Sequence, residues 1–267
     1  MKVTPTNVGL VLVLLFLGQG IASGQSLESY WIAPQPDAAW TTADHKVDAF
    51  VADQREPQNA RHLARVFRKF HHSFLRKYQA YADFPSLFNS GTYDCLTATT
   101  LLNHVLTKLG YEAEVIETTY HIFIKVRLPD GEVLLETTDR VGGFIMDDQL
   151  VADRTSRYRD DKSFVSSSGN GYRYRSSVYR TVSARDLVGL LLYNQAVKAY
   201  NSQQWISSAK YLEASFTEYP SDRCYELAAI LLRTLHERAE INHEARRSLL
   251  EHLAPVIVRR SATVAVN

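Results

Sequence analysis

A helical pattern of apolar residues follows directly after a cysteine in the first half of the chain. Five apolar residues fall on one face of a helix: Leu101, Leu102, Val105, Leu106 and Leu109. Gly110 comes next, and glycine commonly ends a helix because it adopts left-handed backbone angles without strain. The pattern predicts a helix over 95–109 with Cys95 in its first turn. A cysteine at that place feels the positive end of the helix dipole, which favours the thiolate.

A β-hairpin is predicted downstream of this helix. An apolar segment rich in β-branched residues covers 122–128, and a Pro-Asp-Gly turn signal occupies 129–131. The chain then returns antiparallel as far as Glu136. Since His121 begins the first strand and Glu136 ends the second, the hairpin brings an imidazole and a carboxylate near each other. Together with Cys95 they form the set that a nucleophile, a base and an orienting acid require.

These residues and their neighbours resemble the core of the transglutaminase-like superfamily. The resemblance is carried by three short motifs: Tyr93-Asp94-Cys95, the segment 120–126 around His121, and the segment 135–139 around Glu136. It extends over residues 65–145. The resemblance implies an α+β fold with a papain-like core, in which a helix packs on a small antiparallel sheet.

The resemblance assigns a role to each of five residues. Cys95 would be the nucleophile, His121 the base and Glu136 the orienting acid, with Asp139 as the alternative acid. Asn89 is a candidate oxyanion donor by analogy with papain-like sites. We therefore expect a thiol enzyme that attacks an amide or peptide carbonyl. Hydrolysis is favoured over transfer to an amine, because water is the default acceptor.

Further elements are predicted on both sides of this core. Residues 58–78 have an apolar and a basic face and are predicted as an amphipathic helix, whereas 25–43 have no period and are predicted as an extended lead-in. Residues 150–182 alternate arginine and tyrosine around a Gly- and Ser-rich centre. This pattern favours a flexible tip between two strands, either a lid or a plain surface loop.

Two antiparallel helical hairpins are predicted at the carboxyl end, over 183–267. The first of them resembles one tetratricopeptide repeat, in which small residues allow close packing of helices. Two hairpins are too few for an independent solenoid. We therefore expect this helical tail to pack against a transglutaminase-like domain formed by residues 25–182.

The amino terminus has the features of a secretory signal peptide. Lys2 precedes an apolar run over 8–17, and small residues at 22–24 offer a cleavage site before Gln25. The prediction is a signal peptide over 1–24 and a secreted or periplasmic protein with no membrane span after cleavage. An uncleaved membrane anchor is the alternative.

Composition and charge narrow the range of partners. The chain of 267 residues is 45% hydrophobic and has a formal net charge of +1, which gives no long-range attraction to nucleic acid. No cluster of histidine, cysteine and carboxylate residues has ligand spacing, so we predict no metal and no cofactor. The expected partners are a peptide or protein substrate and a protein partner at the helical tail.

Two other interpretations stay open. The chain has two cysteines, Cys95 and Cys224, and we expect both to be free because Cys224 lies in a helical stretch of another region. A disulfide between them, which an oxidising compartment allows, would remove the nucleophile and leave a structural protein. The other interpretation is a catalytically inactive scaffold that binds a protein or peptide partner through its helical tail.

Overall fold

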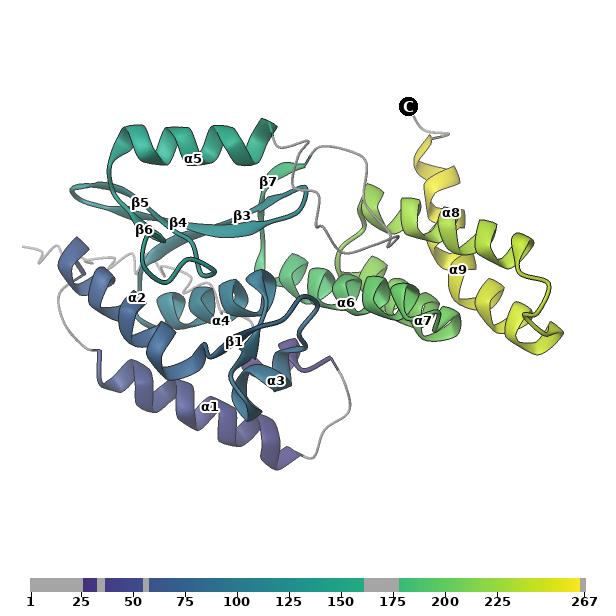
Figure 1. Ribbon diagram of the computed structural model, residues 1–267, viewed down its shortest axis with the longest axis horizontal. Helices are drawn as coiled ribbons and strands as arrows, with labels where there is room; N and C mark the ends of the chain where they lie inside the picture. The colour runs from purple at the N-terminus through teal and green to yellow at the C-terminus, as the bar shows by residue number, and fades with distance from the viewer. Residues whose placement is uncertain (1–25, 33–36, 55–57, 161–177, 265–267) are drawn as a thin grey trace, which may run out of the picture.

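A five-stranded antiparallel sheet forms the middle layer of the structure (Figure 1). This computed structural model describes residues 26–32, 37–54, 58–160 and 178–264. In spatial order the strands are β6 (Phe144–Ile145), β5 (Gly131–Leu135), β4 (Ile122–Leu128), β3 (Glu112–Thr118) and β7 (Tyr179–Val182). Helices cover both faces of the sheet, so the α+β class predicted from the sequence is confirmed.

The two faces of the sheet are buried against different helices, because alternate residues of a strand point to opposite faces. Ile124 belongs to the main hydrophobic core, together with residues of α4 (Cys95–Lys108). Its neighbour Phe123 packs on the other face with Val151 of α5 (Asp148–Asp160). Figure 1 shows α4 and α5 on opposite sides of the sheet. The sheet is therefore a buried layer between helices.

Helix α4 begins at Cys95 because Asp94 caps it. The Asp94 carboxylate accepts a hydrogen bond from the Thr97 N–H at 2.8 Å, and the Asp94 N–H donates to the Thr97 hydroxyl at 2.9 Å. The helix ends at Lys108, and Gly110 follows with a φ of +80°. The predicted helix is thus confirmed to within one residue, with Cys95 as its first residue.

The amino-terminal helices lie beyond α4, on the same side of the sheet (Figure 1). They are η1 (Leu27–Tyr30), α1 (Asp37–Ala52), α2 (Ala60–Phe74) and α3 (Phe84–Asn89). The prediction of an extended lead-in over 25–43 is wrong, since η1 and the start of α1 fall within it. In α1, Ala43 and Val47 are buried four residues apart, so one short apolar stripe attaches this helix to the core.

Helix α2 is shorter than the helix predicted over 58–78. Asn59 caps its start by accepting a hydrogen bond from the backbone of the first turn. After Phe74 the chain becomes extended and forms β1 (Lys77–Tyr78), which pairs in parallel with β2 (Thr92–Tyr93). This pairing with a distant segment ends the helix before its amphipathic pattern ends.

The segment 150–182 is not a single loop. Its first part is helical and belongs to α5, which buries Val151 against the sheet. Its last part forms β7, which pairs antiparallel with β3. Its centre, 161–177, lies outside the described residues, as does the predicted signal peptide. The predicted flexible tip at the Gly- and Ser-rich centre thus lies outside the described residues. Of the two strands expected beside it, β7 is present, whereas residues 150–160 form a helix in place of a strand.

The helical tail packs on the rest of the protein. It consists of α6 (Ala184–Asn201), α7 (Trp205–Glu218), α8 (Asp222–Glu237) and α9 (His243–Val264). Small residues bring α6 and α7 close together: the Ser215 hydroxyl donates to the Gly189 carbonyl at 2.8 Å, and a Cβ on Gly189 would lie 2.2 Å from the Tyr219 Cβ. Apolar residues of the tail share one hydrophobic core with α4 and the sheet. Within the described part of the chain, no helix has the length and apolar character needed to cross a membrane.

Candidate active site

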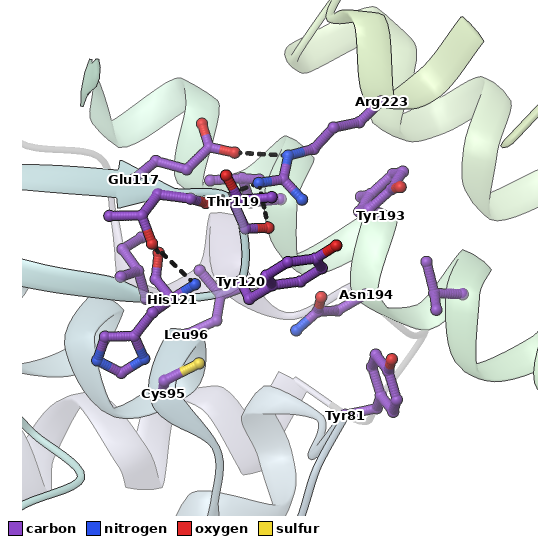
Figure 2. Close-up of a pocket in the computed structure, with 14 residues that line it drawn as sticks. Tyr81, Cys95, Leu96, Glu117, Thr119, Tyr120, His121, Tyr193, Asn194 and Arg223 are labelled. Atoms are coloured by element: carbon purple, nitrogen blue, oxygen red, sulfur yellow. Dashed lines mark hydrogen bonds and ion pairs between the residues drawn. The ribbon is translucent and has the colours of Figure 1, made fainter. Parts of the chain in front are cut away.

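Cys95 and His121 line one cavity, which has a volume of about 150 Å³ (Figure 2). Cys95 is half-buried at the start of α4, and His121 directly precedes β4. Thr118 fixes the turn between β3 and β4: its N–H donates to the His121 carbonyl at 2.8 Å, and its hydroxyl accepts from the His121 N–H at 3.0 Å. Figure 2 shows the thiol and the imidazole at the same end of the cavity.

A hydrogen bond joins His121 to Glu136. The Nε2 atom of His121 lies 2.5 Å from Oε2 of Glu136. In the pairing of β4 with β5, Ile124 lies opposite Leu135. His121, just before β4, and Glu136, just after β5, therefore lie near each other at one end of the hairpin. Because Nε2 is engaged, Nδ1 is the ring nitrogen left to accept a proton from a thiol.

Glu136 is ionised although it is only 1% exposed. Its Oε2 also accepts from the Tyr158 hydroxyl at 2.7 Å, and its Oε1 accepts from the Thr138 N–H at 3.1 Å and the Thr138 hydroxyl at 2.7 Å. Burial by itself would raise the pKa of Glu136. The bonds from His121, Tyr158 and Thr138 outweigh burial and lower the pKa to about 2. An anionic carboxylate therefore faces the imidazole at neutral pH.

Tyr158 is a residue of this site that the sequence reasoning missed. It comes from α5, and its ring centroid lies 5.0 Å from that of His121 and 5.2 Å from that of Phe123. Burial and the neighbouring carboxylate of Glu136 raise the pKa of Tyr158, so its hydroxyl stays a donor. Val151 and Tyr158 are seven residues apart on the same face of α5. That helical spacing is the signal by which the sequence could have placed Tyr158 against the sheet.

The thiol of Cys95 is protonated. Burial raises the pKa of Cys95 well above its usual value, and the charges of Asp94 and Glu136 raise it further. The N–H groups of Leu96 and of Cys95 itself oppose this only in part. The helix terminus thus favours the thiolate as expected, but burial and two carboxylates outweigh it. Among the described residues, no hydrogen bond joins the Cys95 sulfur to His121.

Two other residues predicted for the site lie away from the cavity. The Asp139 carboxylate accepts from the N–H groups of Val141 and Gly142 at 3.2 and 2.8 Å, and so shapes the turn between β5 and β6. Asn89 is exposed at the end of α3 and does not line the cavity. Glu136 is thus the carboxylate that contacts His121, and Asn89 is not placed to bind an oxyanion in this cavity.

The helical tail forms the opposite wall of the cavity (Figure 2). Helix α6 contributes four lining residues: Leu190, Tyr193, Asn194 and Val197. The amide Nδ2 of Asn194 donates to Oδ2 of Asp94 at 3.2 Å, which joins α6 to the cap of the helix that carries Cys95. Burial raises the pKa of Asp94 to about 6, against the hydrogen bonds from Thr97 and Asn194. The tail is therefore part of the site.

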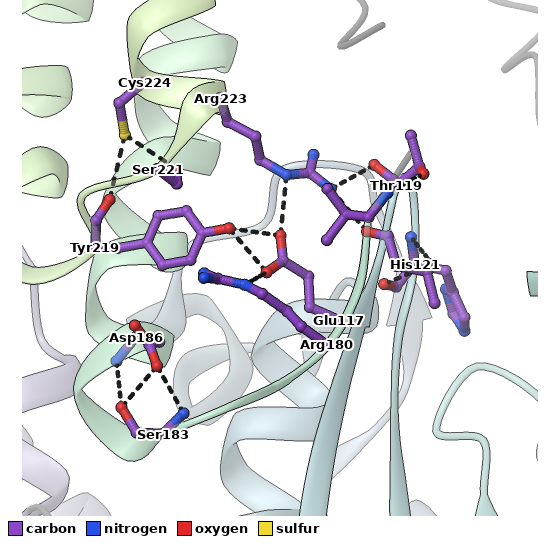
Figure 3. A network of polar contacts seen from close by, with 12 residues as sticks. Glu117, Thr119, His121, Arg180, Ser183, Asp186, Tyr219, Ser221, Arg223 and Cys224 are labelled. Atoms are coloured by element: carbon purple, nitrogen blue, oxygen red, sulfur yellow. Dashed lines mark hydrogen bonds and ion pairs between the residues drawn. The ribbon is translucent and has the colours of Figure 1, made fainter. Parts of the chain in front are cut away.

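A buried charged network holds this wall against the sheet (Figure 3). Glu117 of β3 is 3% exposed and pairs with Arg180 of β7 and Arg223 of α8, each at 2.9 Å. The Tyr219 hydroxyl donates to both oxygens of Glu117, at 2.7 and 2.8 Å. Two cations and one hydroxyl therefore share a single carboxylate.

Arg223 extends this network to the turn that precedes His121. Its Nη2 donates to the carbonyl oxygens of Thr118 and Thr119, both at 2.7 Å. Since His121 lies two residues beyond Thr119, the start of α8 is joined directly to the segment that positions the imidazole.

Cys95 and Cys224 are both free thiols. Cys224 is fully buried in α8, where its sulfur donates to the Tyr219 carbonyl at 3.5 Å. Burial raises the pKa of Cys224, so this thiol too is neutral. The prediction of two free cysteines is confirmed, and the interpretation that depends on a disulfide between them is wrong.

No family model, curated protein or solved structure matches the chain. Over the residues that the structure describes, no group of three or more His, Cys, Asp or Glu side chains is placed to hold a metal ion. The site itself offers a neutral thiol and an imidazole bonded to an ionised carboxylate, and the thiol and the imidazole share one cavity.

Proposed function

We propose that this protein is a thiol enzyme that acts on amide or peptide bonds, with Cys95 as nucleophile, His121 as base and Glu136 as orienting acid. One observation carries the proposal: an ionised, buried Glu136 bonds Nε2 of His121, and His121 lines a cavity together with Cys95. A carboxylate on one side of an imidazole holds the tautomer whose other nitrogen accepts a proton.

In the proposed reaction, proton transfer accompanies attack. The Cys95 sulfur bonds to the carbonyl carbon, the π electrons move to the carbonyl oxygen, and Nδ1 of His121 takes the thiol proton. Glu136 stabilises the imidazolium that forms. As the intermediate collapses, the leaving amine takes the proton from His121 and a thioester remains on Cys95. Water then attacks the thioester, gives a proton to His121, and releases the acid as Cys95 regains its proton.

The protonated resting thiol fits this order of events. Since the pKa of Cys95 is well above its usual value, the thiol is protonated before substrate binds. The base must therefore act during the attack, as it does for a hydroxyl nucleophile. Water is the acceptor we propose, because nothing about the cavity selects an amine in its place.

The arrangement of elements supports the resemblance to the transglutaminase-like superfamily. A cysteine opens a helix that packs on an antiparallel sheet, and a histidine and an acid stand at the ends of two neighbouring strands. We propose a papain-like core on this basis. Glu136 takes the place that an aspartate often holds in that superfamily.

The lining of the cavity favours an uncharged, apolar or aromatic group next to the bond that is cleaved. Its apolar residues are Leu96, Ile122, Leu190 and Val197, and its tyrosines are Tyr81, Tyr120 and Tyr193. Glu117 and Arg223 also line it, but they are paired with each other, and Arg180 binds the same carboxylate. A peptide or protein with such a side chain is therefore the substrate class we propose.

Covalent labelling tests the proposal. Iodoacetamide and p-nitrophenyl acetate under native conditions are expected to modify Cys95 and to spare the buried Cys224, as mapped by peptide mass spectrometry. His121→Ala is expected to slow both reactions at least about tenfold, because the base is lost. His72→Ala is the matched control, since His72 is exposed on α2, and it should leave both rates unchanged. Modification of Cys95 that does not depend on His121 would overturn the proposal.

A catalytically inactive binding scaffold is the second candidate. It is favoured by the protonated thiol and by the lack of a hydrogen bond between Cys95 and His121 among the described residues. In that case the cavity and the helical tail hold a peptide or protein partner without chemistry. Cys95 would then react with both reagents at the rate of an ordinary half-buried thiol, with or without His121.

Export remains a prediction. It rests on residues 1–24, which lie outside the described residues. A mature chain that begins at or near Gln25 in exported material is the expected result, and a secreted or periplasmic location would follow from it.

A further inference from the structure

Asn194 of α6 brings an amide to the side of the cavity that holds the thiol. It lines the cavity, and its Nδ2 donates to Asp94 at 3.2 Å. Asp94 immediately precedes Cys95 in the chain. Figure 2 shows the amide nitrogen of Asn194 turned toward the side of the cavity where Cys95 and Leu96 lie. The amide therefore contacts the residue that precedes the nucleophile, from a helix about a hundred residues further along the chain.

The amide nitrogen has one hydrogen to spare. An asparagine amide carries two N–H hydrogens. The bond to Asp94 uses one of them, and within the described part of the chain the second has no acceptor. In a cavity-lining residue, such a free hydrogen is available to a ligand oxygen.

The proposed reaction needs a donor at this place. Attack by Cys95 places a negative charge on the carbonyl oxygen, and donors already aimed at that oxygen are a large source of rate acceleration. The first-turn N–H groups of a helix lack intrahelical partners, so the N–H of Cys95 supplies one donor. A second, from a side chain, is missing, because Asn89 is exposed and outside the cavity.

Other polar groups of the cavity are already engaged. The Tyr81 hydroxyl bonds Asn201, and Tyr120 and Tyr193 each make contacts of their own. Arg223 is held by Glu117 and by two carbonyl oxygens of the β3–β4 turn. Asn194 is therefore the cavity-lining residue whose amide contacts Asp94 and still has a hydrogen available to a ligand.

We propose that Asn194 is the side-chain oxyanion donor of this enzyme, an inference that rests on the proposed function. Its Nδ2 stays anchored on Asp94 through one hydrogen and gives the other to the oxygen of the tetrahedral intermediate, while the Cys95 N–H donates to the same oxygen. Helix α6 thus supplies a catalytic residue, and the helical tail completes the active site.

Two reagents that differ in their chemistry test this assignment. Alkylation of Cys95 by iodoacetamide displaces iodide and forms no oxyanion, whereas acylation by p-nitrophenyl acetate passes through a tetrahedral oxyanion. Asn194→Ala is expected to slow acylation by about 100-fold or more and alkylation by less than about threefold. Gln195→Ala is the matched control, since Gln195 is the next residue on α6 and its amide reaches the Tyr81 carbonyl instead. It should leave both rates unchanged.

The ratio of the two rates separates direct donation from an effect through Asp94. An effect through the charge of Asp94 would change the reactivity of the thiol itself, and acylation and alkylation would then fall equally. Asp94→Asn keeps α4 capped, but its oxygen must accept from the Thr97 N–H, so its amide nitrogen faces Asn194 and the anchor is lost. The ratio of acylation to alkylation should therefore fall in Asp94→Asn as it does in Asn194→Ala, and the double variant should show little further fall. If acylation and alkylation fall equally in Asn194→Ala, Asn194 is not the donor. If the wild-type protein is not acylated at Cys95 at all, the proposed function fails, and this inference fails with it.

Discussion

Hydrogen-bond donors from several parts of the fold lower the pKa of Glu136. Burial favours the neutral acid, and His121, Tyr158 and Thr138 together reverse that preference. Thr138 is a near neighbour in sequence, but His121 lies across the hairpin and Tyr158 comes from a helix on the far face of the sheet. The fold therefore keeps this buried acid ionised, although burial alone would favour its neutral form.

Glu136→Gln is expected to keep the fold and to lower the reactivity of Cys95. Glutamine has the same size but cannot stabilise the imidazolium that forms at His121. Acylation of Cys95 by p-nitrophenyl acetate should fall by about 100-fold or more, as measured by release of p-nitrophenol. Asp139→Asn is the control, since Asp139 bonds the turn and not His121. A loss in Asp139→Asn with no change in Glu136→Gln would give the role to Asp139.

The stability of the protein is expected to depend on Glu136 in acid. The pKa of Glu136 is about 2 in the folded protein, against an ordinary value of 4.5. A depressed carboxyl pKa contributes stability that is complete above pH 4.5 and is lost as the pH falls toward 2. Urea unfolding between pH 7 and pH 2.5 should show a steeper fall in the free energy of unfolding for the wild type than for Glu136→Gln. Equal slopes would contradict the depressed pKa.

At the scale of elements, local signals predicted some segments well and others poorly. Helix α4 carries its cap, its apolar face and its terminating glycine within one stretch, and the β4–β5 hairpin carries its own turn. Helix α5 has apolar residues at helical spacing, but its arginines and tyrosines, beside a Gly- and Ser-rich centre, favour a tip between two strands. Its helical face packs on the sheet through Val151 and Tyr158.

The turn between β5 and β6 is expected to tolerate alanine at Gly142 and not at Gly143. A Cβ on Gly143 would lie 2.2 Å from the carbonyl oxygens of both Asp139 and Glu136, which are backbone atoms that cannot move aside. Gly143→Ala should therefore cost about 2 kcal/mol or more of stability and slow Cys95 acylation by displacing Glu136.

Gly142→Ala is the matched control for this turn. Gly142 is exposed, and its Cβ would meet at 2.9 Å only the flexible end of the Asp139 side chain. A cost below about 1 kcal/mol is expected, with acylation unchanged. Urea unfolding and p-nitrophenol release measure the two effects, and similar values for both variants would contradict this account of the turn.

At the scale of the whole molecule, the Glu117 network joins the sheet to the helical tail. Glu117→Gln is expected to lower the free energy of unfolding by about 3–5 kcal/mol at neutral pH, because the buried Arg223 loses its counter-charge, as does the more exposed Arg180. Glu114→Gln, on the same strand but exposed and 3.8 Å from Arg127, should cost less than about 1 kcal/mol. Denaturant unfolding of both variants gives the comparison, and equal losses would mean that the network does not hold the tail.

The sequence by itself determined the elements that carry the candidate nucleophile, base and acid. Cys95 at the start of its helix, and His121 beside Glu136 across a short hairpin, follow from caps, periodicity and a turn that act over a few residues. The tertiary structure alone decided the rest. Asn194 meets Asp94 across a separation of 100 residues, and burial beside two carboxylates, not the helix dipole, sets the protonation of Cys95. Such features depend on which faces of distant elements pack together, and no local pattern encodes that choice.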